Sequence, residues 1–186
     1  MSDDHEPGDP FIYGFVIAIL LMLLAIAPST CFGGRYVPTI RKFGEWDRPP
    51  VVRVCASAPV GVQTVRHAMR QIERHGGRFG GVTFGPCERW PDDGWIWVTG
   101  ALPGVGGTVL GATIPLEGET GHIRAAIVSL ADGIGAIVVR HELLHALGIE
   151  HTDEIAHIMA PSMILGGPSW AGIREAFRGP ISPEKP

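Results

Sequence analysis

Three histidines and a glutamate between residues 141 and 151 are the side chains in this sequence best suited to chemistry. They follow the pattern H-E-x-x-H-x-x-G-x-x-H, whose fixed positions are His141, Glu142, His145, Gly148 and His151. Residues i and i+4 lie about 40° apart around a helix, so the first two imidazoles can point at one metal ion. Gly148 tolerates a positive φ, and a sharp turn there would return His151 to the same ion. Two histidines on a surface helix would explain a bare H-E-x-x-H, but not the added glycine and third histidine.

Such a cluster supports metal-assisted hydrolysis. Three neutral imidazoles leave one tetrahedral position of Zn²⁺ open to water, which is the arrangement of a catalytic zinc ion. The sequence therefore predicts one catalytic Zn²⁺ bound by His141, His145 and His151. Glu142 projects about 100° round the helix from His141, and we expect it to act as the general base on zinc-activated water.

The eleven residues from 141 to 151 match the zinc signature of the metzincin metalloproteases. Over roughly residues 48–180 the chain resembles the matrixin-like branch of that family. The segment IMAP at 158–161 resembles the family's methionine turn, which places Met159 under the zinc imidazoles without binding the metal. Some metzincins carry a tyrosine at the position of Pro161, where it steadies the transition state, and this sequence lacks that tyrosine. The residues expected to support the site structurally are Gly148, Met159 and Pro161.

The resemblance implies a zinc-dependent endopeptidase that hydrolyses peptide bonds of extended protein substrates. The substrate would pair with an edge strand at Thr108–Thr113, and the candidate substrate-binding residues are Leu110, Gly111 and Ala112. No structural zinc is expected, since the edge strand lacks the histidine that matrixins use and His122 cannot replace it alone. No calcium is expected either, because Asp-rich loops are missing. The short linker leaves no room for the cysteine-bearing propeptide of matrixins.

Two other functions remain open at this stage. One is a zinc hydrolase of a non-protein substrate or of a peptide bond in a cell wall. The other is a membrane-tethered, non-catalytic binding module with a zincin fold. Glu142 argues against the second, because a binding module has no need of a general base.

Apolar periodicity predicts an alternation of strands and helices after residue 50. With the resemblance, it implies an α+β, zincin/metzincin-like fold: a twisted mixed five-stranded sheet with an active-site helix, a backing helix and a C-terminal helix, preceded by a single N-terminal transmembrane helix. The expected strands are 51–56, 81–84, 95–98, 107–115 and 122–130, and the expected helices are 62–75, 133–147 and 170–177.

The N-terminal region contains an uncharged run at 11–27, about 26 Å long as a helix and therefore long enough to cross a bilayer core. Residues 25–27 offer a signal-peptide cleavage site, but Pro28 and the absence of a basic n-region favour an uncleaved anchor. The expected organisation is an acidic tail (1–10), a transmembrane anchor or signal segment (11–28), a linker (29–48), the catalytic domain (49–180) and a tail (181–186).

The side of the membrane stays open. Basic residues lie only after the apolar run, which places the domain in the cytoplasm by the positive-inside rule. Proteases of this kind more often act outside, so the resemblance favours an extracytoplasmic domain. The basic residues concerned are Arg35, Arg41, Lys42, Arg48 and Arg53.

The composition excludes several classes of protein. A formal net charge of −4, from 15 basic and 19 acidic residues, argues against nucleic-acid binding by bulk positive charge. The expected partners are a protein or peptide substrate and a membrane, with the oligomeric state open. Three cysteines exclude a disulfide-dense scaffold; Cys87 is expected to pair with Cys55 or to be a free thiol, and Cys31 has no assigned partner. His157 has no assigned role and is expected to be exposed.

Overall fold

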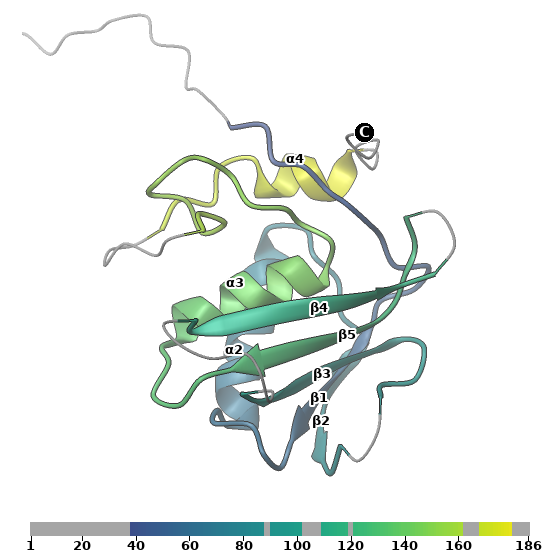
Figure 1. Cartoon of the computed structure of the whole chain (residues 1–186). Helices are drawn as coiled ribbons and strands as arrows, with labels where there is room; N and C mark the ends of the chain where they lie inside the picture. The colour runs from purple at the N-terminus through teal and green to yellow at the C-terminus, as the bar shows by residue number, and fades with distance from the viewer. Residues whose placement is uncertain (1–37, 88–89, 102–108, 119–120, 162–167, 180–186) are drawn as a thin grey trace, which may run out of the picture. The chain divides into compact units, whose positions relative to one another are not determined.

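A five-stranded sheet is the framework of the domain (Figure 1). The computed structural model describes residues 38–87, 90–101, 109–118, 121–161 and 168–179. The strand order across the sheet is β2-β1-β3-β5-β4, with β4 antiparallel to β5 and the other three neighbouring pairs parallel. The strands are β1 (Val51–Cys55), β2 (Gly81–Gly85), β3 (Trp95–Gly100), β4 (Gly111–Glu117) and β5 (Ile123–Leu130).

Three helices accompany the sheet: α2 (Val62–Arg74), α3 (Ala136–Ala146) and α4 (Ile173–Arg178). The apolar residues of α2 recur every three or four positions, which gives this helix one buried face. α3 is buried along most of its length, between α2 on one side and strands β4 and β5 on the other. The sheet contributes alternate residues to the same core, which include Val52, Val54, Ile96, Val98, Ala126 and Val128.

The predicted α+β fold class is wrong. The described part of the chain has a mixed α/β architecture, in which α2 connects the parallel strands β1 and β2 and three of the four strand pairs are parallel. The order of elements along the sequence does not determine this arrangement, because strand pairing is decided by long-range contacts. The final helix also begins at Ile173 rather than at residue 170.

The predicted transmembrane helix is not supported either. Within the described residues, no helix is both long enough and apolar enough to span a bilayer. The segment expected to do so, 11–28, lies outside those residues, as do the acidic tail and Cys31.

A disulfide joins Cys55, the last residue of β1, to Cys87, which follows β2. Of the two states left open for Cys87, the structure therefore shows the paired one. The bond crosslinks the parallel strands β1 and β2. These strands form one edge of the sheet, and β4 forms the opposite edge.

Removing this crosslink should destabilise the domain. The two cysteines are 32 residues apart, and closing a loop of that size is worth about 4 kcal/mol in the chain-entropy model. Denaturant unfolding of Cys55→Ala/Cys87→Ala should show a free energy of unfolding lower by about that amount. Reduction of the wild-type chain should give a similar loss. A double variant as stable as the oxidised wild type would contradict the structural role.

Candidate metal centre

Helix α3 carries three of the four candidate catalytic residues. His141 and Glu142 are each only 5% exposed, and His145 lies one turn beyond His141 on the same side of the helix. The helix ends at Ala146, and Gly148 then adopts a φ of +89°. A side chain at Gly148 would collide with the backbone of Gly44, so both the backbone angle and the close packing require glycine there.

The turn at Gly148 brings His151 back to the helix. The Nε2 atoms of His141 and His145 are 3.0 Å apart. The Nε2 atom of His151 lies 2.9 Å from that of His145 and 3.2 Å from that of His141. Two imidazole nitrogens on one tetrahedral zinc ion lie about 3.3 Å apart, given zinc–nitrogen bonds of about 2.0–2.1 Å. The three ring nitrogens are therefore close enough to share one metal ion.

Hydrogen bonds on the other side of the rings fix the tautomers. His141 Nδ1 lies 2.7 Å from the carbonyl oxygen of Ile158, and His145 Nδ1 lies 2.7 Å from that of Ile149. A carbonyl oxygen can only accept, so each Nδ1 donates its proton and each Nε2 is left with a free lone pair. Lone pairs that face one another at about 3 Å repel unless a cation lies between them. The donor set therefore fits a metal ion.

The electrostatics of the cluster favour the same state. Burial lowers the pKa of His141 and of His151. Burial, together with the neighbouring charges of His141 and His151, lowers the pKa of His145 to about 3. Imidazoles with depressed pKa values are neutral near pH 7, which is the protonation state that binds metal.

Glu142 lies beside the histidine cluster and is held from strand β4. Thr113 Oγ1 lies 2.7 Å from Glu142 Oε2 and 2.9 Å from the main-chain oxygen of the same residue. Burial raises the pKa of Glu142, and the hydrogen bond from Thr113 acts in the opposite direction. A Cβ at Gly111 would lie 2.8 Å from Glu142 Cγ and 2.9 Å from Oε1, so this glycine leaves room for the carboxylate.

A cleft of about 810 Å³ opens over these residues. One wall is the metal cluster with Glu142, and the other is the start of β4 with the two residues before it. The predicted substrate-binding residues Leu110, Gly111 and Ala112 all line the cleft, together with Pro161. β4 is an edge strand, and it begins at Gly111, later than the expected start at 107–108, which lies outside the described residues.

The segment that contains Met159 contacts the histidine cluster through the main chain of Ile158. Met159 is fully buried in the core, and the carbonyl of the preceding Ile158 accepts the hydrogen bond from His141. The main-chain N–H of Met159 donates to His157 Nδ1 at 3.0 Å, and His157 Nε2 lies 2.8 Å from the carbonyl oxygen of Ala171. The turn is therefore tied both to a metal-site histidine and to the segment that leads into α4.

The expectation that His157 is exposed is wrong, since only 4% of this residue is accessible. Both ring nitrogens have main-chain hydrogen-bond partners, so burying the imidazole leaves no polar atom of the ring unsatisfied. Two supporting residues, His157 and Thr113, were thus not identified from the sequence. For His157, its position two residues before Met159 is a weak indication of a role near the site. For Thr113, nothing in the neighbouring sequence indicates a contact with Glu142.

No protein-family model matches the chain, and no curated protein matches it. The geometry supports a zincin-like metal centre in general terms, on the three histidines that can hold a metal ion.

His157 should be needed for tight metal binding although it does not face the metal. His157→Gln removes the fixed imidazole that holds the Met159 turn and, through it, the Ile158 carbonyl that orients His141. Such indirect support is worth about 10–100-fold in metal affinity, which competition with a chromogenic chelator would measure. The exposed His67 on α2 provides the control, and His67→Gln should bind metal as the wild type does. Equal affinity in all three proteins would show that His157 does not position the site.

Proposed function

We propose that the chain is a zinc-dependent endopeptidase of the metzincin type, with a site that resembles the matrixin-like branch. One observation carries the proposal: three imidazole Nε2 atoms converge within 3.2 Å of one another, beside a buried glutamate, in a cleft bounded by an edge strand. His141, His145 and His151 would hold the ion. When bound, zinc supplies Lewis acidity, which acidifies water and polarises a carbonyl oxygen.

Glu142 would move the proton in this reaction. Its Oε2 is engaged by Thr113, and Oε1 is the oxygen left to accept a proton from the attacking water. The carboxyl group would then donate that proton to the nitrogen of the leaving amine as the peptide bond breaks. Burial raises the pKa of Glu142, which makes its carboxylate a stronger base than an exposed glutamate.

Strand β4 would position the substrate. It pairs with β5 on one side, and the described residues place no strand on its other side. Leu110, just before the strand, is 52% exposed and lines the cleft. An extended peptide could add to this edge through main-chain hydrogen bonds, which would lay its backbone across the metal cluster.

We also propose that the domain works in an oxidising, extracytoplasmic compartment. The support is the disulfide between Cys55 and Cys87, since such bonds persist outside the reducing cytosol. The disulfide therefore favours the extracytoplasmic side of the membrane over the cytoplasmic side, both of which the sequence left open.

Glu142→Gln separates catalysis from metal binding. The substitution keeps the shape of the side chain but removes its basicity, so turnover should fall by about 10²–10⁴-fold while zinc content stays at one ion per chain. The assay is cleavage of an unfolded protein substrate, with mass spectrometry of the products and metal analysis of both proteins. A zinc-loaded wild-type chain that cleaves no peptide bond, or a variant that cleaves as well as the wild type, would contradict the proposed function.

Thr113→Val should change the pH dependence of catalysis. Loss of the hydroxyl removes a hydrogen bond that favours the charged carboxylate, so the pKa of Glu142 should rise further. Since the base is inactive when protonated, the acid limb of kcat/KM should move to higher pH. Thr83→Val, at an exposed position on β2, is the control and should leave the profile in place. An acid limb that stays in place or moves to lower pH in Thr113→Val would contradict this role.

A further inference from the structure

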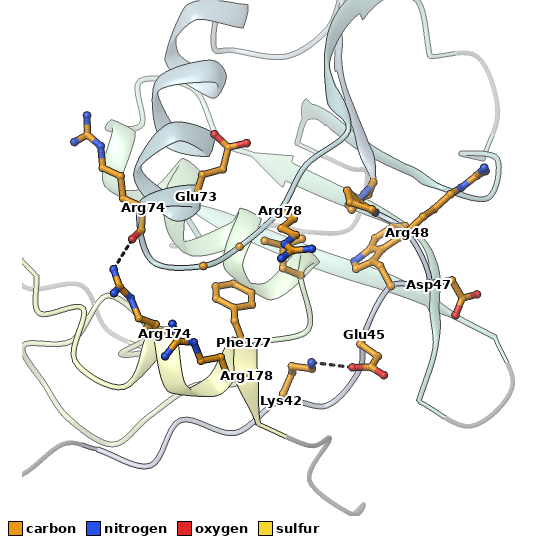
Figure 2. Close-up of a pocket in the computed structure, with 16 residues that line it drawn as sticks. Lys42, Glu45, Asp47, Arg48, Glu73, Arg74, Arg78, Arg174, Phe177 and Arg178 are labelled. Carbon is orange, nitrogen blue, oxygen red and sulfur yellow. Dashed lines mark hydrogen bonds and ion pairs between the residues drawn. The ribbon is translucent and has the colours of Figure 1, made fainter.

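A second pocket, of about 770 Å³, lies where the end of α2, helix α4 and the segment 42–50 meet (Figure 2). It shares no lining residue with the cleft over the metal cluster. Its walls include the aromatic rings of Trp46 and Phe177, and the rest of its surface is dominated by charged side chains. The proposed peptidase activity makes no use of this pocket.

The pocket concentrates positive charge in a chain of negative net charge. One of its three carboxylates already has a cationic partner, since Glu45 pairs with Lys42 at 3.0 Å. Asp47 Oδ1 lies 2.7 Å from Nδ1 of His122, which is a cation only when protonated. Within the described residues, no carboxylate lies within 4.0 Å of the arginines that line the pocket. These arginines are Arg48, Arg74, Arg78, Arg174 and Arg178.

Three of the five arginines come from the two segments that meet at Phe177. Arg174 and Arg178 lie on α4 with Phe177, and Arg78 follows Gly77, which packs against the Phe177 ring, whereas the side chains of Arg48 and Arg74 extend away from this ring in Figure 2. Arg174 Nη2 donates to the carbonyl oxygen of Arg74 at 2.9 Å, which holds this guanidinium at the rim and leaves its other N–H groups free for a ligand.

The chain before Arg78 is closely packed against α4. A Cβ at Gly77 would lie 2.5 Å from Ile72 Cγ2 and 3.1 Å from Phe177 Cζ, so the turn that ends α2 rests directly on α4. Arg78 therefore leaves the backbone beside the ring of Phe177.

Local stabilisation of the helices does not account for the cluster. Arg74 and Arg178 lie in the last turns of α2 and α4, where a cation interacts favourably with the helix dipole. Arg78 lies outside both helices, and Arg174 is the second residue of α4, where a cation is unfavourable. All five arginines that line the pocket are exposed, so their guanidinium groups are accessible to an anion from solution.

We propose that this pocket binds the phosphate group of an anionic ligand. Guanidinium groups bind phosphate oxygens through paired, charge-assisted hydrogen bonds, and a phosphate offers enough oxygens to satisfy several arginines at once. A small soluble compound and the head group of a phospholipid are the two sources of such a phosphate. Both present the same chemistry to Arg78, Arg174 and Arg178.

The test uses the full chain and two probes. Inorganic phosphate is titrated while the arginine Nε–Hε signals are followed by NMR, and co-sedimentation is measured with phosphatidylcholine vesicles that contain or lack phosphatidic acid. Arg78→Gln/Arg178→Gln keeps much of the length of both side chains and removes two charges. We expect it to weaken binding of the effective probe by about tenfold or more. Arg66→Gln/Arg70→Gln, on the part of α2 outside the pocket, is the charge-matched control and should bind as the wild type does.

Each outcome decides the proposal. Binding that only the pocket variant loses supports it, and the probe that binds identifies the source of the phosphate. Absence of binding to both probes overturns it, as does an equal loss in the two double variants, which would indicate attraction to bulk charge. Peptide cleavage and zinc content should be unchanged in the pocket variant, so failure here is distinguishable from failure of the proposed peptidase function.

Discussion

The convergence of three imidazole nitrogens is the constraint on which the rest of the site depends. His141, His145 and His151 hold their Nε2 atoms 2.9–3.2 Å apart, and the carbonyl oxygens of Ile149 and Ile158 keep two of the lone pairs directed inward. This arrangement is repulsive without a cation, so the polypeptide must supply the free energy that keeps the rings together. A bound metal ion would return that free energy as stability of the folded state.

The fold supplies this free energy through packing around the cluster on the sides away from the cleft. Helix α3 is buried between α2 and the sheet, which fixes the direction of the first two rings. The turn at Gly148 is held by the N-terminal part of the domain, where the N–H of Phe43 donates to the Gly148 carbonyl at 2.8 Å. His157 ties the following turn to Ala171 ahead of α4. Strand β4 completes the site from the other side through Thr113. The metal cluster therefore depends on contacts among segments that are far apart in the sequence.

The parts of the site that follow from local geometry could be predicted from the sequence, and the parts that depend on long-range contacts could not. The i, i+4 spacing determines how His141 and His145 point, and a glycine after the helix indicates the turn. The contact between Thr113 and Glu142 joins residues 29 apart and leaves no periodic signal. The same reason explains the wrong fold class: β3 pairs with β5 although β4 lies between them in the chain, and nothing in the local pattern of either strand specifies that partner. Burial of His157 likewise depends on a partner 14 residues away.

The two pockets give the domain two separate chemistries, one built from neutral imidazoles and a carboxylate and the other from guanidinium groups. The first of these can be tested most directly through its metal ion. X-ray absorption spectroscopy at the zinc edge, on the chain loaded with one equivalent of Zn²⁺, reports the ligands of the ion directly. Three imidazole nitrogens at about 2.0–2.1 Å and one oxygen ligand from water are expected, since three protein ligands leave one position open to solvent. A zinc ion with fewer than three imidazoles, or with cysteine sulfur in its coordination sphere, would contradict this expectation.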